Sequence, residues 1–120
     1  MPGASDTAYP RMRANPSDKE LSEVYTPTES ELAFARKRTH QPVQRIGLLL
    51  VLKIFQRLGY GVRYSEIPSV VVRHIAACAG FSDIPETMPS YDLKTTRDRH
   101  LMLVREFLGV MILSISFGPF

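Results

Sequence analysis

The longest hydrophobic pattern in the chain is "IGLLLVLKIFQRLGY", near its middle. At helical spacing its large side chains cover about 200° of a helix that runs from about Val43 to Leu58, where Gly59 and Gly61 end it. A helix with so wide an apolar face is expected at the centre of a core. Lys53 interrupts the run well short of the roughly 20 apolar residues that a membrane span needs, so we expect no membrane helix. The narrower polar side of this helix carries Arg45, Lys53, Gln56 and Arg57.

A helix is also predicted in "TPTESELAFARKR", because its first residues are typical of a helix start. Thr26 and Glu29 have the spacing of a capping box, and Pro27 then takes the first helical position. Leu32 and Ala35 supply a modest apolar face. Acidic residues lead this segment and basic residues close it, as the helix dipole favours.

Two further helices are predicted toward the C-terminus, joined by the Pro-rich connection "FSDIPETMPSYD". The first runs from about Pro68 to Ala79. Its Val70–Val72 run is also typical of a strand, but the alanines and Gly80 favour a helix. The last helix follows "TTRDRH", and we expect it to end at Gly109. Its core stripe consists of Leu101, Val104 and Leu108, with Phe107 beside it.

These patterns predict an all-α protein, with one small domain of about four helices in orthogonal or bundle packing. No pair of strands with hairpin signals occurs, and 120 residues suit a single domain. Residues 1–22 lack apolar periodicity, so we expect a flexible N-terminal arm there. The helical domain is predicted over residues 23–110. Residues 111–120 would form a short, uncharged apolar tail, either strand-like or helical.

Composition narrows the classes of function without choosing one. The 15 Lys and Arg residues exceed the 12 Asp and Glu residues, and the net charge of +3 permits a nucleic-acid role but does not require it. There is no glycine-rich nucleotide loop, and the acidic residues and histidines are scattered. We therefore predict no catalytic residue, no metal site, no cofactor and no small-molecule substrate. Cys78, the only cysteine, suits a reducing cytoplasm, and its helical spacing from Val71 and Ile75 predicts a buried side chain.

The basic groups are the remaining candidates for chemistry, and one set lies in "RKRTHQPVQR". This segment gathers cations around the corner between the first two predicted helices. It either complements the dipole of a helix C-terminus or provides a patch that contacts phosphate groups. The residues concerned are Arg36, Lys37, Arg38, His40 and Arg45.

The second basic segment, "TTRDRH", places Arg97, Arg99 and His100 in the first turns of the last helix. Partial positive charge at a helix N-terminus disfavours cations there by about 0.3–1 kcal/mol each. Arg97 pairs with Asp92 or Asp98 and Arg99 is solvated, or the segment forms a site for an external anion. A DNA phosphate is the obvious candidate for that anion.

Taken together, "YTPTESELAFARKRTHQPVQRIGLLLVLKIFQRLGY", "IPSVVVRHIAACAG" and "YDLKTTRDRHLMLVREFLGV" resemble the N-terminal domain of the Tn-three-family (class II) replicative transposases. The resemblance covers about Leu21 to Val110, in ungapped blocks that occur in the family's order. Thr96, Arg97, Arg99 and His100 match the "TRxRH" pattern of the family's basic motif.

This resemblance implies a helical module that binds double-stranded DNA at the terminal inverted repeats of a transposon. The family's catalytic domain, which holds magnesium on carboxylates, lies far beyond the matching region, so no catalytic residue carries over and we expect no enzyme activity. After Val110 the sequence leaves the family pattern, and we expect a truncated transposase located in the cytoplasm, on the nucleoid when bound to DNA. The predicted DNA contacts are Arg36, Lys37, Arg38, Arg45, Arg97, Arg99 and His100.

Two alternatives to DNA binding remain open. The chain is a protein–protein module that contacts full-length transposase through its apolar tail and an exposed Met102, or it is a truncated remnant without a function.

Overall fold

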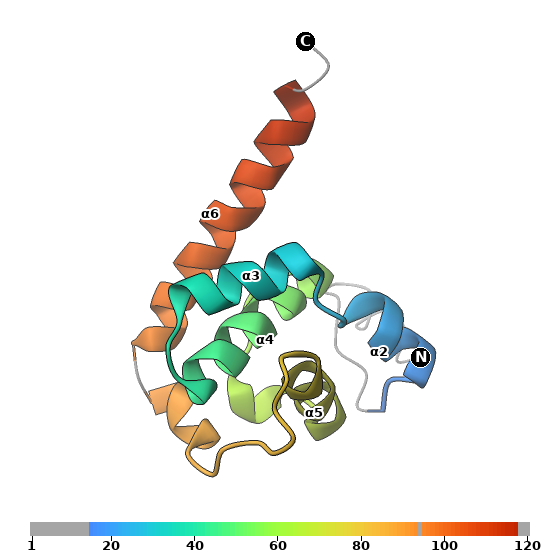
Figure 1. Cartoon of the computed structure of the whole chain (residues 1–120), viewed down its shortest axis with the longest axis vertical. Helices are drawn as coiled ribbons and strands as arrows, with labels where there is room; N and C mark the ends of the chain where they lie inside the picture. The colour runs from blue at the N-terminus through green and yellow to red at the C-terminus, as the bar shows by residue number, and fades with distance from the viewer. Residues whose placement is uncertain (1–14, 94, 118–120) are drawn as a thin grey trace, which may run out of the picture.

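The computed structural model describes residues 15–93 and 95–117, which form five α-helices, two 3-10 segments and no strand (Figure 1). The all-α class predicted from the sequence is confirmed. We expected about four helices, and the described residues contain five. In chain order the elements are α2 (Asp18–Val24), α3 (Glu29–Arg38), α4 (Pro42–Leu58), η1 (Tyr64–Glu66), α5 (Ser69–Cys78), η2 (Met88–Leu93) and α6 (Thr96–Phe117).

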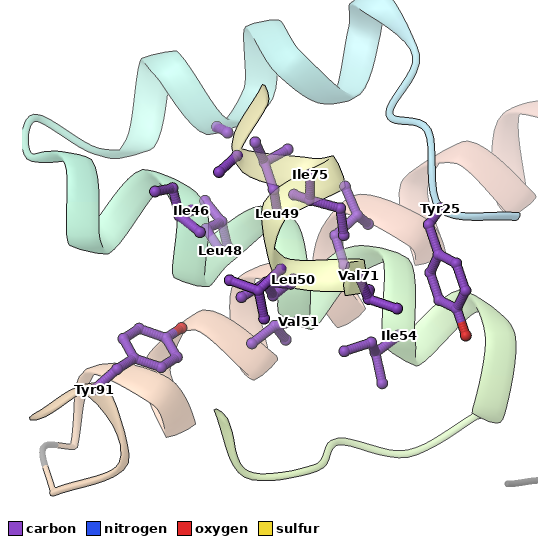
Figure 2. Close-up of a cluster of buried hydrophobic side chains, with 14 of the residues drawn as sticks. Tyr25, Ile46, Leu48, Leu49, Leu50, Val51, Ile54, Val71, Ile75 and Tyr91 are labelled. Carbon is purple, nitrogen blue, oxygen red and sulfur yellow. The ribbon is translucent and has the colours of Figure 1, made fainter. Parts of the chain in front are cut away.

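Helix α4 is the centre of the core, as its wide apolar face predicts. It begins at Pro42 and ends before Gly59, whose left-handed backbone (φ 84°) favours glycine. Every residue from Ile46 to Ile54 is buried, because α3, α5, α6 and η2 all pack against this helix. Figure 2 shows its side chains clustered with those of α5, with Tyr25 and Tyr91 at opposite edges of the cluster.

Helix α5 confirms the preference for a helix over a strand in the β-branched run. It runs from Ser69 to Cys78, with Pro68 at its N-cap. Val71 and Ile75 are completely buried against the core. The proline and the alanines therefore outweigh the strand preference of three consecutive valines.

The start of α3 differs from the prediction by two residues. Thr28, not Thr26, is the N-cap: its hydroxyl accepts from the Glu31 N–H at 3.2 Å, and the Glu31 carboxylate accepts from the Thr28 N–H at 2.8 Å. The predicted Thr26–Glu29 box is wrong because the Thr26 hydroxyl donates to the Leu21 carbonyl and lies 2.8 Å from His74 Nε2. Thr26 therefore joins the α2–α3 connection to α5.

A buried ion pair between Lys53 and Glu31 explains why the later register of the cap is preferred. We expected Lys53 on the solvent side of α4, but it is buried, with Nζ 3.0 Å from Glu31 Oε1. Gln56 Nε2 donates to the other carboxylate oxygen at 2.7 Å. Burial alone would raise the pKa of Glu31, but hydrogen bonds from Thr28, Gln56 and Lys53 outweigh it, so the pKa is lowered.

Helix α2 corrects the prediction of a flexible arm that continues to residue 22. The Ser17 side chain accepts from the Glu20 N–H and caps this helix. Leu21 and Tyr25, which are four residues apart and so lie on one face, are both buried in the core. The sequence does not predict this helix, because so short an apolar pattern stands out little from the polar residues around it. Residues 1–14 lie outside the described residues.

Helix α6 continues through Gly109, where we expected it to end, and reaches Phe117. A glycine inside a helix costs only about 1 kcal/mol relative to alanine, which does not by itself end a helix. The backbone of the predicted tail is thus helical as far as it is described, and α6 extends away from the other helices in Figure 1. Val104 of its predicted core stripe is completely buried, and Phe107 stacks on Phe34 of α3 with ring centroids 4.3 Å apart.

The substitution Glu31→Gln tests whether the buried ion pair stabilises the contact between α3 and α4. It keeps the shape of the side chain and an oxygen that accepts from Thr28, but removes the negative charge that balances the buried Lys53 charge. We expect the free energy of unfolding, measured by urea denaturation, to fall by about 3–5 kcal/mol. The double variant Glu31→Gln with Lys53→Met should recover most of this loss, because it leaves no unpaired charge.

Glu29→Gln is the matched control, because Glu29 is an exposed residue in the same first turn. It should cost only the helix-dipole contribution of about 0.3–1 kcal/mol. Equal losses for Glu29→Gln and Glu31→Gln would mean that the buried pair does not stabilise the fold.

Candidate nucleic-acid interface

The fold brings the two basic segments of the sequence together around one hollow, which we call the polar hollow. Its volume is about 220 Å³. It is lined by Gln41, Val43, Gln44, Thr87, Ser90, Tyr91 and Thr96. Gln41 follows Arg38 by three residues and Thr96 precedes Arg99 by three, so both cations are within about 11 Å of chain of the hollow. In Figure 1 the C-terminal end of α3 and the start of α6 lie on the same side of the molecule, at the left.

Four predicted cations are exposed at the end of α3 and the start of α6, the two helix ends next to this hollow, and we call them the basic surface: Arg36, Lys37, Arg38 and Arg99. Within the part of the chain that the structure describes, none of them has an ion pair or a hydrogen bond from its side chain. The first three close α3, where the helix dipole favours cations. Arg99 lies in the first turn of α6, where the dipole disfavours it. These side chains are free to bind an external anion.

Arg45, another predicted contact, holds the corner between α3 and α4. Its Nε donates to the Thr39 hydroxyl at 3.2 Å and its Nη2 donates to the Thr39 carbonyl at 2.9 Å. The Thr39 hydroxyl in turn donates to the Ala35 carbonyl at 2.6 Å, and Thr39 is buried. The half-buried Arg45 side chain therefore gives the carbonyl that follows α3 a hydrogen-bond donor, and it positions the cations that precede Thr39.

His100 is not available for DNA, and its prediction as a contact is wrong. Its side chain is only 3% exposed and shares a hydrogen bond with the Tyr91 hydroxyl, which lies 2.6 Å from Nδ1. Burial, with a smaller effect of the Arg99 charge, lowers the pKa of His100 to about 4, so the imidazole is neutral near pH 7. Burial likewise raises the pKa of Tyr91. The pair is a neutral contact between η2 and α6.

Gly47 allows this contact to pack on α4. A methyl group at Gly47 would overlap the ring of Tyr91, so the ring reaches the helix backbone only because position 47 has no side chain. Tyr91 thus connects α4, η2 and α6 at one point. Little in the sequence indicates this role, since Tyr91 is nine residues from His100 and lies in a Pro-rich connection.

Arg97 lies on a different side of α6 from Arg99. Two residues correspond to about 200° around a helix, and Arg97 lines a separate hollow of about 130 Å³ with Gly61 and Val62. Its Nη2 is 4.0 Å from the Asp98 carboxylate, which is largely exposed, so this pair contributes little to stability. Arg97 therefore does not belong to the basic surface.

Asp92, the other partner considered for Arg97, is occupied by the backbone. Its carboxylate accepts from the Tyr64 N–H at 2.6 Å and from the Ser65 N–H at 3.0 Å. Burial alone would raise the pKa of Asp92, but these two hydrogen bonds, helped by the Arg97 charge, lower it. Asp92 therefore joins η2 to η1 through hydrogen bonds, and its interaction with Arg97 at the start of α6 is the smaller effect.

Other chemistry is sparse in the described residues. There, no three His, Cys, Asp or Glu side chains come together in a way that would hold a metal ion. Cys78, predicted to be buried, is half-buried, with Sγ 3.7 Å from His74 Nε2, and burial raises the pKa of its thiol. No helix among these residues combines the length and the apolar character needed to cross a bilayer.

Comparison with known proteins adds a family to this all-helical domain. The family model of DUF4158, a domain of unknown function, matches residues 2–116, and the chain belongs to that family. The match includes the N-terminal residues and continues past Val110, where the resemblance to the transposases ends. No curated protein and no solved structure matches the chain.

The buried His100 predicts a pH dependence of stability that an exposed histidine would not produce. In the unfolded chain His100 takes up a proton near its ordinary pKa of 6.5, whereas in the folded chain it does so only near 4. The free energy of unfolding should therefore fall as the pH drops from about 6.5 toward 4, by at most about 1.4 kcal/mol per pH unit from this residue. Urea denaturation of His100→Gln between pH 7 and 5 should lack this slope.

His40→Gln, which changes an exposed histidine, is the control and should keep the slope of the unchanged protein. An identical slope in the unchanged protein and in His100→Gln would show that His100 is not held neutral by burial.

Proposed function

We propose that this chain is a DNA-binding module of a transposase that contacts the terminal inverted repeats of a transposon. One structural observation supports the proposal above the others: the two basic segments meet around the polar hollow and leave four exposed cations without partners among the described residues. The resemblance of residues 21–110 to the N-terminal domain of Tn-three-family transposases supplies the kind of partner. The proposed activity is binding alone.

The arrangement of charges suits the DNA backbone. Duplex DNA carries about one negative charge per 1.7 Å of its axis, and phosphate contacts from Arg and Lys position a protein on it. The cations that close α3 and Arg99 on α6 belong to different helices, and we propose that they contact different phosphates. A phosphate beside Arg99 would also offset the unfavourable position of this cation at a helix N-terminus. Arg45 and His100 act as positioning residues.

The salt dependence of DNA binding tests the basic surface. Removing one cation that neutralises a phosphate should reduce the slope of log K against log salt concentration by about 0.9. We expect that reduction for Arg38→Gln and for Arg99→Gln, and about twice that reduction for the double variant. The measurement is a fluorescence anisotropy titration of the full chain against a labelled duplex at several salt concentrations.

Arg73→Gln is the matched control, because Arg73 is an exposed arginine on α5 with no ion pair among the described residues. Its slope should equal that of the unchanged protein. Slopes that stay the same in all the variants, or that fall equally for Arg73→Gln, would reject the basic surface as the site of phosphate contact.

The alternative of a protein partner has weaker support. Met102 is 67% exposed on α6, as that alternative requires. A single exposed hydrophobic side chain is ordinary on a protein surface and does not make an interaction patch.

Tight binding of the labelled duplex that does not change with salt would count against the phosphate contacts proposed above.

A further inference from the structure

We infer that Gln41 and Gln44, at the start of α4, read the edges of bases in the DNA, with adenine as the preferred base. The inference rests on the proposed function and deepens it, because the basic surface explains contact with phosphates but not the choice of a sequence. Phosphate contacts carry no sequence information directly, so a module that finds transposon ends needs other side chains that distinguish base pairs.

Both glutamine side chains line the polar hollow and are without hydrogen-bond partners among the described residues. Gln41 is the N-cap of α4, yet its side chain makes no capping hydrogen bond. Gln41 is exposed and Gln44 is half-buried. Gln41 precedes the first helical residue and Gln44 lies in the first turn of α4, and both side chains line the same hollow. Two amides with unused donors and acceptors are therefore presented together.

The rest of the hollow carries no charge. Val43, Thr87, Ser90, Tyr91 and Thr96 complete its lining. The Ser90 hydroxyl donates to the Thr87 carbonyl at 2.6 Å, and the Tyr91 hydroxyl is shared with a buried histidine. The two amides are also the side chains of the hollow that carry a donor and an acceptor on separate atoms, so each can pair at once with a donor and an acceptor on one partner.

A base edge matches this chemistry better than a phosphate does. Phosphate oxygens only accept hydrogen bonds, which suits the four cations of the basic surface. Adenine presents a donor at N6 beside an acceptor at N7 in the major groove, and a glutamine amide matches the two with its own oxygen and nitrogen. A surface that reads DNA sequence is expected to contact phosphates with its cations and base edges with uncharged polar groups. The basic surface and the two amides fit these two roles.

The position of the two residues at a helix start also suits base contact. Helices that read the major groove commonly contact base edges with their N-terminal residues. Ile46–Ile54 of α4 is buried and the exposed Gln56 and Arg57 lie at its other end, so the first turn is the part of α4 next to the hollow that is available for such contact. α4 would therefore approach the DNA with its end rather than along its length, and this limits the readout to the few base pairs that face Gln41 and Gln44.

Selection from a random-sequence duplex pool, with the full chain as the binding protein, tests this inference. The unchanged protein should enrich a site that contains adenine at one or two positions. Gln44→Ala and Gln41→Ala should each reduce the preference for the enriched site, over a duplex changed at that adenine, by about 5- to 150-fold. Their salt slopes should equal that of the unchanged protein, since the phosphate contacts remain.

Arg38→Gln is the contrasting variant, because it should weaken binding to all duplexes alike and keep the preference for the site. A preference that is unchanged in both glutamine variants would overturn the inference. Salt-dependent binding without any enriched sequence would also overturn it, while leaving the proposed phosphate contacts in place. If the unchanged protein shows no salt-dependent binding to any duplex, the proposed function fails and the inference fails with it.

Discussion

The complete burial of α4 is the constraint on which the rest of this structure depends. Residues 46–54 are buried on all sides, and each large side chain among them is worth roughly 1.5–3 kcal/mol when removed from water. Such a helix requires neighbours around its whole circumference. It also requires compensation for Lys53, whose charge is buried with it. Glu31 supplies that compensation, and the start of α3 is placed accordingly.

The enclosure of α4 also decides which parts of it reach the surface. With its middle covered, the helix presents its first turn, where Gln41 and Gln44 line the polar hollow. Two hydrogen-bonded contacts beneath the surface hold the elements on either side of that turn. Arg45 binds Thr39 at the corner with α3, and His100 binds Tyr91 next to the start of α6. The exposed cations therefore occupy defined places, because polar contacts beneath them fix the ends of their helices.

The comparison of sequence and structure separates what local patterns predict from what tertiary contacts decide. The bounds of α4 and the helical state of α5 follow from apolar spacing, proline and glycine, which are all visible in the sequence. The register of the capping box does not, because Thr26 and Thr28 each precede a glutamate by three residues, and the local signal of Pro27 favours Thr26. Only the contact of Glu31 with Lys53, 22 residues away, favours the second register.

The same distinction between local patterns and tertiary contacts applies to the candidate site. Exposure of Arg36, Lys37 and Arg38 is the usual outcome for cations that close a helix, whereas the burial of His100 depends on Tyr91, and the close approach of Tyr91 depends on Gly47. Nor does the sequence indicate that two basic segments more than fifty residues apart lie around one hollow.

The unfavourable run of cations in "TTRDRH" is resolved by the rotation of the helix itself. Consecutive residues of a helix point about 100° apart, so Arg97, Arg99 and His100 enter three different environments. His100 is neutral and buried, and thus adds no positive charge at the helix start. Arg97 lies toward Asp98 and the loop at Gly61. Of these three residues, Arg99 alone keeps an uncompensated charge at the N-terminal end of α6. The local electrostatic cost is therefore that of one arginine, and a single bound phosphate is enough to offset it.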